Sequence, residues 1–245
     1  MDIHLRGKTI LVTGGTGTLG RAIVEKAVTE GAGVYFTFHQ NQDLAKELIR
    51  KGARGFRLDL RDRSALDLLR DELRKEIASL DGLVLNAAAV RDRTLINLSE
   101  PEFDEVLETD LTSGFLLVKK FLPLLYKSPA GKIVGITSRV GTQGGFGEAN
   151  YAAAKAGLSA LIKTLAQEVG RKGICANAVA PGFMMSPMTA DLPDEVYARQ
   201  RAESVLGCFQ DPGEVSDFVI YLLSDSVKKV SGQIFYFDSR RTKIF

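Results

Sequence analysis

Short apolar runs alternate along the chain with longer amphipathic stretches. The apolar runs predict buried strands, at residues 8–13, 33–38, 54–58, 82–86, 132–137, 173–179 and 233–237. The stretches between them favour helices, at residues 21–28, 41–51, 62–79, 101–127, 150–170 and 212–224. Repeated strand–helix–strand units indicate a mainly parallel, doubly wound α/β sheet with helices on both faces.

The chain has the length of one α/β domain with a large core. It contains 245 residues, a size at which single α/β domains are common. No repeat, low-complexity tract or linker divides it. We therefore expect residues 1–245 to form a single domain.

Composition and charge exclude several classes of protein. Hydrophobic residues make up 45% and charged residues 25% of the chain, as in ordinary globular proteins. A net charge of +2 implies neither a nucleic acid nor an anionic membrane as partner. The N-terminus lacks the apolar core of a signal peptide, and no apolar stretch approaches the roughly 18 residues of a spanning helix.

The few cysteines and histidines do not suggest a metal site. Cys175 and Cys208 lack metal-ligand spacing, and His4 and His39 are isolated. Two unpaired thiols are typical of a reducing compartment. We expect a cytoplasmic protein that holds no metal.

A glycine-rich turn follows the first predicted strand and precedes the first predicted helix. Gly15, Gly17 and Gly20 match the G-x-G-x-x-G fingerprint in this context. Glycines let the backbone approach a pyrophosphate, and a helix N-terminus supplies N–H donors and partial positive charge. The turn predicts a dinucleotide site, although such a turn could serve strand–helix packing alone. The expected contacts are Gly14, Thr16, Gly17, Thr18 and Leu19.

The end of the second strand bears on the choice of cofactor. Enzymes that prefer NAD tend to place Asp or Glu about twenty residues after the turn, to hold the ribose 2′-hydroxyl. Here Thr37 and His39 stand in that region, and no carboxylate occurs before Asp43. Thr16, Thr37 and His39 could bond to a phosphorylated ribose, although His39 could equally be a solvated loop residue. The pattern favours NADP(H) and leaves NAD(H) open, since no Arg stands in the obvious position.

Three residues further along suit proton exchange with a carbonyl or alcohol oxygen. Ser138 ends an apolar strand, and Tyr151 and Lys155 lie four residues apart in a predicted helix. Residues at this spacing share a helix face. A nearby cation favours the phenolate, bringing the phenol toward a useful acid–base range. Chance spacing is the alternative, and the glycine turn counts against it.

In order along the chain, these motifs resemble those of the short-chain dehydrogenase/reductase family. The resemblance covers nearly the whole length and is closest to the 3-oxoacyl-[acyl-carrier-protein] reductases, with Glu148-Ala-Asn-Tyr-Ala-Ala-Ala-Lys-Ala-Gly157 and Asn177-Ala-Val-Ala-Pro-Gly-Phe183 both typical. It implies a Rossmann fold with seven parallel strands, a homotetramer (or a dimer), and a mobile substrate lid over residues 183–206.

The resemblance also implies residue roles. Tyr151 would donate a proton to the carbonyl oxygen, Ser138 would polarise that carbonyl, and Lys155 would lower the Tyr151 pKa and bond the nicotinamide ribose. Asp110 stands where the family has a fourth catalytic residue, an Asn. Further cofactor contacts would come from Asp59, Leu60, Asn86, Ala87, Ala88, Pro181, Gly182, Met184 and Ser186.

Four positions depart from the family pattern. Thr18 replaces a motif glycine, and Ala88 adds bulk where the family has glycine. Asp110 brings a charge beside the expected proton relay of Lys155. The usual Asp-Gly-Gly near the C-terminus reads Asp238-Ser-Arg-Arg241, which bears on the packing of the tail and on tetramer contacts.

Three functions follow from these observations. The first is NADPH-dependent reduction of a 3-oxoacyl thioester or a related ketone. The second is oxidation of a secondary alcohol with NAD, and the third is a weakened dinucleotide-binding regulator. Lys127, Lys132, Arg171 and Lys172 could receive an acidic carrier protein, and Met184, Met185 and Met188 could line an irregular apolar pocket.

Overall fold

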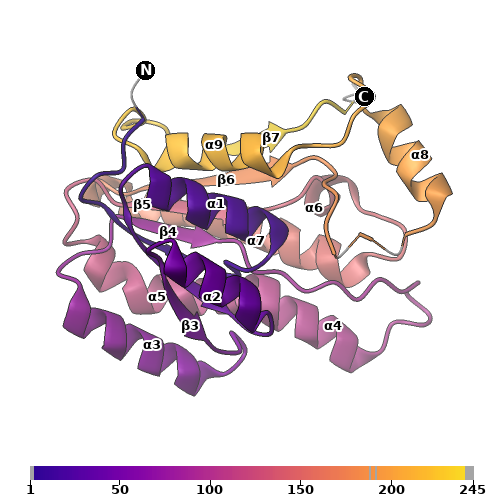
Figure 1. Cartoon of the computed structure of the whole chain (residues 1–245). Coiled ribbons are helices and arrows are strands. Elements are labelled where there is room, and N and C mark those ends of the chain that lie inside the picture. Colours follow the sequence, from indigo (N-terminus) through magenta and orange to yellow (C-terminus); the bar gives the residue numbers. More distant parts are fainter. Residues whose placement is uncertain (1–2, 188, 191, 241–245) are drawn as a thin grey trace.

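Seven parallel strands form the centre of the molecule (Figure 1). The computed structural model describes residues 3–187, 189–190 and 192–240. The strands are β1 (Thr9–Val12), β2 (Gly33–Phe38), β3 (Arg54–Arg57), β4 (Gly82–Leu85), β5 (Lys132–Ile136), β6 (Cys175–Pro181) and β7 (Ile234–Phe237). They are arranged in the order β3-β2-β1-β4-β5-β6-β7, and every pairing is parallel. This confirms the predicted Rossmann fold class.

Helices cover both faces of the sheet and create two apolar cores. The first core lies under α1 (Thr18–Thr29), α2 (Gln42–Arg50) and α9 (Pro212–Leu223). The second lies under α3 (Arg63–Glu76), α5 (Ser113–Leu125) and α7 (Ala149–Val169). Neighbouring residues of a strand enter different cores, as Ile10 and Leu11 do, because successive side chains point to opposite faces.

The remaining helical segments lie mostly near the carboxyl ends of the strands. They are α4 (Glu100–Leu107), a π-helical segment (Glu108–Thr112), α6 (Val140–Gln143), a 3₁₀ turn (Gly170–Lys172) and α8 (Asp194–Glu203). Of these, α8 stands apart from the sheet, beyond the end of β7 (Figure 1). It lies within the predicted lid, of which Met188 and residue 191 fall outside the described residues.

Local sequence determines where several helices begin. The side chains of Asn41, Asp62 and Asp211 accept backbone N–H groups at the starts of α2, α3 and α9. Ser99 and Glu102 form a reciprocal capping box at the start of α4. Each cap satisfies donors that have no partner inside the helix.

The helix predicted over residues 101–127 is continuous in sequence but not uniform in structure. Between α4 and α5 the chain adopts a π-helical segment over Glu108–Thr112. Such segments change the direction of the side chains that follow and often occur at functional sites. The segment contains neither Gly nor Pro, and the sequence therefore gave no signal for it. The short helix α6 was also not predicted.

The order of the strands determines where a ligand can enter. The chain runs from β1 through β2 to β3, and then returns to place β4 on the other side of β1. Connections on the two sides of this point depart in opposite directions, which opens a crevice at the carboxyl ends of β1 and β4. The glycine turn and most of the predicted site residues lie on that edge.

Candidate active site

The glycine turn between β1 and α1 is tightly packed on its inner side. Gly14 has a φ of +65°, and a Cβ there would lie 2.9 Å from the Ala87 Cα. A Cβ on Gly20 would lie 2.1 Å from the carbonyl oxygen of Gly14. Both positions therefore require glycine for internal reasons.

Gly17 differs from the other glycines of the turn. It is exposed, and a Cβ there would meet only the carbonyl oxygen of Gly14, at 3.4 Å. Gly17 is the N-cap of α1, and among the described residues no side chain caps the helix and no acidic residue lies in its first turn. Exposed N–H donors without a competing carboxylate suit a pyrophosphate. This end of the site thus fits a dinucleotide cofactor.

Thr13 and Asn86 join the turn to β4. The Thr13 hydroxyl accepts the backbone N–H groups of Asn86 (2.9 Å) and Ala87 (3.0 Å). The Asn86 amide donates to the carbonyl oxygens of Thr13 (2.9 Å) and Gly14 (3.2 Å). Asn86 therefore holds the turn in place, and its contact with a cofactor stays a prediction. Thr13 is not among the predicted site residues, although a polar residue that ends an apolar strand is a usable signal.

The residues predicted to contact the adenosine part of the cofactor differ in burial and in their hydrogen-bond partners. Thr37 is buried, and its hydroxyl accepts the backbone N–H of Gly14 at 3.3 Å, so it supports the turn. His39 is exposed, with its Nε2 3.9 Å from Asp59. Hydrogen bonds from the Arg61 side chain lower the pKa of Asp59 to about 2, so Asp59 is ionised at neutral pH. Direct cofactor contacts of Thr16, Thr37, His39 and Asp59 stay predictions.

Leu19 and Leu60, two further predicted cofactor contacts, have side chains buried in the apolar cores. Leu19 and Leu60 are 6% and 8% exposed and belong to the first and second core, respectively. Any contact they make with a cofactor would come from their backbone, since their side chains pack inward.

Ser138, Tyr151 and Lys155 come together at the carboxyl end of β5. Ser138 follows that strand, while Tyr151 and Lys155 lie in the first two turns of α7. The Lys155 Nζ lies 5.3 Å from the centroid of the Tyr151 ring and donates to the carbonyl oxygen of Ile136 at 3.2 Å. The Ser138 hydroxyl interacts with the Tyr151 phenol and favours its ionisation. The arrangement places a polarising hydroxyl, a phenol and a buried cation in one cluster.

Asp110 joins this cluster from the π-helical segment. Its Oδ1 accepts the backbone N–H of Ala89 at 2.7 Å, and its Oδ2 lies 3.1 Å from the Lys155 Nζ. The side chains of Lys155 and Asp110 are 2% and 0% exposed. Burial raises the pKa of Asp110, against the opposing effect of Lys155. Burial acts to lower the pKa of Lys155, but the Asp110 carboxylate and the Tyr151 phenol raise it overall.

The pKa of Tyr151 is raised, whereas a lysine beside a phenol is expected to lower it. Burial raises its pKa above the ordinary 10.0, and Asp110 and Glu148 act in the same direction. Lys155 and the Ser138 hydroxyl act to lower it. Lys155 and the surroundings of Tyr151 therefore act in opposite directions on its pKa, and the surroundings outweigh the lysine.

The segment after β6 connects the site to the lid and the tail. Gly182 donates its N–H to Phe237, and a Cβ on Gly182 would lie 2.8 Å from the Asp238 Cβ. Met184 packs against the first core. The Ser186 N–H donates to the Thr189 hydroxyl at 2.9 Å.

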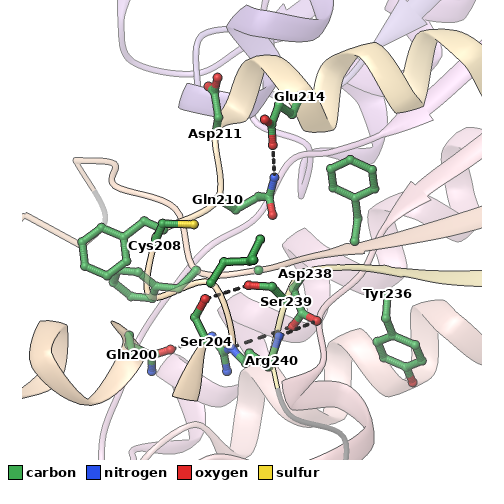
Figure 2. Close-up of a pocket in the computed structure, with 15 residues that line it drawn as sticks. Gln200, Ser204, Cys208, Gln210, Asp211, Glu214, Tyr236, Asp238, Ser239 and Arg240 are labelled. Carbon is green, nitrogen blue, oxygen red and sulfur yellow. Dashed lines mark hydrogen bonds and ion pairs between the residues drawn. The ribbon is translucent and has the colours of Figure 1, made fainter. Parts of the chain in front are cut away.

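The C-terminal tail binds Arg139, the residue next to Ser138. Arg139 donates to Asp238 at 2.8 Å, with both side chains buried, and stacks over Tyr236. Arg240 then reaches Gln200 of α8 at 2.6 Å. Figure 2 shows Gln200, Asp238 and Arg240 at the lining of a cavity. The cavity has a volume of about 400 Å³, and its lining includes none of Ser138, Tyr151 or Lys155. Arg139 could not be identified from sequence, because Asp238 lies far along the chain.

The structure contradicts the prediction that Lys132 could receive a carrier protein. Lys132 is 2% exposed, and its Nζ donates to the carbonyl oxygen of Val227, so it cannot meet a partner protein. Lys127, Arg171 and Lys172 are exposed.

In the described ranges, no group of His, Cys, Asp and Glu has a metal-binding arrangement, and no helix there is long and apolar enough to cross a membrane.

Fold and site together define a class, a dinucleotide-binding oxidoreductase with a Ser–Tyr–Lys cluster. Comparison with known proteins refines this. A family model described as enoyl-(acyl carrier protein) reductase matches residues 15–239. The chain belongs to the short-chain dehydrogenase/reductase family and is an oxidoreductase of that type.

Similar proteins include several curated reductases and solved structures. The 3-oxoacyl-[acyl-carrier-protein] reductase FabG of Aquifex aeolicus is 35% identical, covering 96% of this chain and 98% of that protein. FabG of Escherichia coli is 35% identical, covering 94% and 96%. A structure described as an NAD(P)-dependent gluconate 5-dehydrogenase from Beutenbergia cavernae, with bound NADP, has a TM-score of 0.91 at 30% identity and covers 98% of both chains.

Proposed function

We propose that this protein uses NADPH to reduce a 3-oxoacyl thioester, or a related ketone, to the 3-hydroxy product. The observation that carries the proposal is the joining of Ser138, Tyr151 and Lys155 at the sheet edge that also bears the glycine turn. The FabG relatives support the thioester as substrate class. The structure with bound NADP supports the phosphorylated cofactor.

The proposed chemistry assigns one task to each side chain. NADPH, when bound, supplies the hydride that reduces the carbonyl carbon. Tyr151 donates its phenolic proton to the carbonyl oxygen as negative charge develops there. Ser138 donates a hydrogen bond to the same oxygen and stabilises that charge. Lys155, held by Asp110 and Ile136, bonds the nicotinamide ribose.

The cofactor is held along the crevice between β1 and β4. Gly14, Gly17 and the N-terminus of α1 receive the pyrophosphate, and Thr16, Thr18 and Leu19 add backbone contacts. Asn86, Ala87 and Ala88 would line the cofactor, while Pro181, Gly182, Met184 and Ser186 would cover its nicotinamide end. Thr37 and His39 would serve the 2′-phosphate, and Asp59 and Leu60 the adenine.

The proposal includes the assembly of the protein, its location in the cell and its partner. The protein forms a homotetramer in the cytoplasm and consists of a single domain. Its exposed Lys127, Arg171 and Lys172 receive an acidic carrier protein that presents the acyl chain.

Turnover of an acetoacetyl thioester with NADPH and with NADH tests the proposal. We expect NADPH to support reduction at a higher kcat/KM than NADH. Faster alcohol oxidation with NAD would favour the dehydrogenase alternative. An absence of turnover over a panel of ketones with both cofactors would overturn the reductase proposal and favour a binding or regulatory role.

A further inference from the structure

The buried carboxylate of Asp110 has a consequence for the direction of proton transfer. We propose that Asp110, by pairing with Lys155, keeps Tyr151 protonated and suits the site to ketone reduction rather than alcohol oxidation at neutral pH. The inference rests on the proposed function for its substrate, but its central measurement needs no turnover. Asp110 acts through Lys155, and it is therefore a positioning residue.

The geometry makes Asp110 the main ionic partner of Lys155. The Lys155 Nζ lies 3.1 Å from the Asp110 Oδ2, and both side chains are almost fully buried. The other carboxylate oxygen is held by the Ala89 N–H at 2.7 Å. The carboxylate is thus fixed by the backbone on one side and pairs with the lysine on the other.

A carboxylate at this position changes the field at the phenol. A buried, isolated lysine cation strongly favours a nearby phenolate, because charges interact strongly where water is excluded. With Asp110 ionised, Lys155 belongs to a pair of zero net charge, and the carboxylate offsets part of the attraction of the lysine for a phenolate, in addition to the effect of burial. An amide at position 110 has the same shape and accepts the same Ala89 N–H, but it leaves the lysine charge in force.

The other charged groups that face Tyr151 do not reverse this effect. Glu148, just before α7, opposes ionisation of the phenol, and the Ser138 hydroxyl favours it. Glu148 is itself faced by Asp92, Arg199 and Arg240. Among the residues that the structure describes, Asp110 is the one that both opposes the phenolate and neutralises Lys155. Glu148→Gln is therefore the matched control, because it removes a carboxylate while leaving the lysine pair intact.

The two directions of the reaction need opposite forms of Tyr151. Ketone reduction needs the phenol, which gives its proton to the carbonyl oxygen, and alcohol oxidation needs the phenolate, which takes the hydroxyl proton. A phenol that stays protonated remains a proton donor over a wide pH range. It becomes a base only in alkaline solution, so oxidation is slow at neutral pH.

Direct titration of Tyr151 tests the inference. Near-ultraviolet phenolate absorbance is followed in the protein without added nucleotide, because the nicotinamide cation of NADP⁺ would itself favour the phenolate. Subtraction of the Tyr151→Phe signal isolates this residue, and the chain contains no Trp to interfere. We expect Tyr151 of the unaltered protein to ionise at or above the ordinary 10.0. Asp110→Asn should lower that midpoint by at least about one pH unit, a tenfold change, and Glu148→Gln should lower it less.

The outcomes separate this inference from the proposed function. Equal midpoints in the unaltered protein and Asp110→Asn would overturn the inference even if the ketone is reduced. The predicted shift without thioester turnover would support the inference and count only against the proposed substrate. If Asp110→Asn fails to fold, the titration of the unaltered protein can still overturn the inference, since ionisation of Tyr151 well below 10.0 would contradict the role of Asp110.

Discussion

Individual glycines of the cofactor turn have separable roles. Gly20 faces the carbonyl oxygen of Gly14 so closely that any side chain would collide with backbone, whereas Gly17 faces outward with free space. The first residue thus holds α1 against the turn, and the second leaves room for an incoming pyrophosphate. Sequence matching treats the two as equivalent members of one fingerprint, and only the contacts distinguish them.

Replacing each glycine by alanine should therefore give different results. Gly20→Ala should lower the free energy of unfolding by about 1–3 kcal/mol, because the collision outweighs the helix preference of alanine. Gly17→Ala should leave that free energy nearly unchanged and weaken NADPH binding. Urea unfolding and NADPH fluorescence measure the two quantities. Equal destabilisation by both substitutions would contradict this assignment.

At the scale of elements, the C-terminal tail connects α8 to the segment that follows β5. Arg139, next to Ser138, binds Asp238, and Arg240 binds Gln200 of α8. Ser239 also accepts the N–H of Val205 and bonds to the Ser204 hydroxyl, both at 2.7 Å. These contacts use residues at positions where the family pattern has Asp-Gly-Gly. The altered tail thus holds α8 and the residues that follow it. The sequence could not indicate this connection, because the partners lie far apart along it.

Removing the arginine should loosen that helix. Arg240→Ala should speed amide exchange in α8 about fivefold, because a hydrogen bond of about 1 kcal/mol is lost. Amides of β1 and β4 should exchange as before. Hydrogen–deuterium exchange makes the comparison, with Arg63→Ala, at an exposed residue that begins α3, as the control. Unchanged exchange in α8 would show that Arg240 does not hold the lid.

At the scale of the whole molecule, a parallel sheet gathers distant residues onto one edge. Gly14, Asn86, Ser138 and Pro181 each stand at or just after the carboxyl end of a strand. Periodicity and turn residues predicted the strands and therefore this edge. The π-helical segment that turns Asp110 toward Lys155 could not be predicted, since it contains neither Gly nor Pro to mark it. The burial of Lys132 could not be predicted either. A lysine at the start of an apolar strand suggests an exposed strand end, and only its three-dimensional neighbours show that it is buried.

The central claim is that the Tyr151 phenol delivers the proton in a reaction that requires bound NADPH. Comparing Tyr151→Phe with the unaltered protein tests it most directly, by NADPH fluorescence and by turnover of the acetoacetyl thioester. The phenyl ring keeps the packing, so NADPH affinity should stay the same while kcat falls by about 10²–10⁴-fold. Undiminished turnover in Tyr151→Phe would contradict the account.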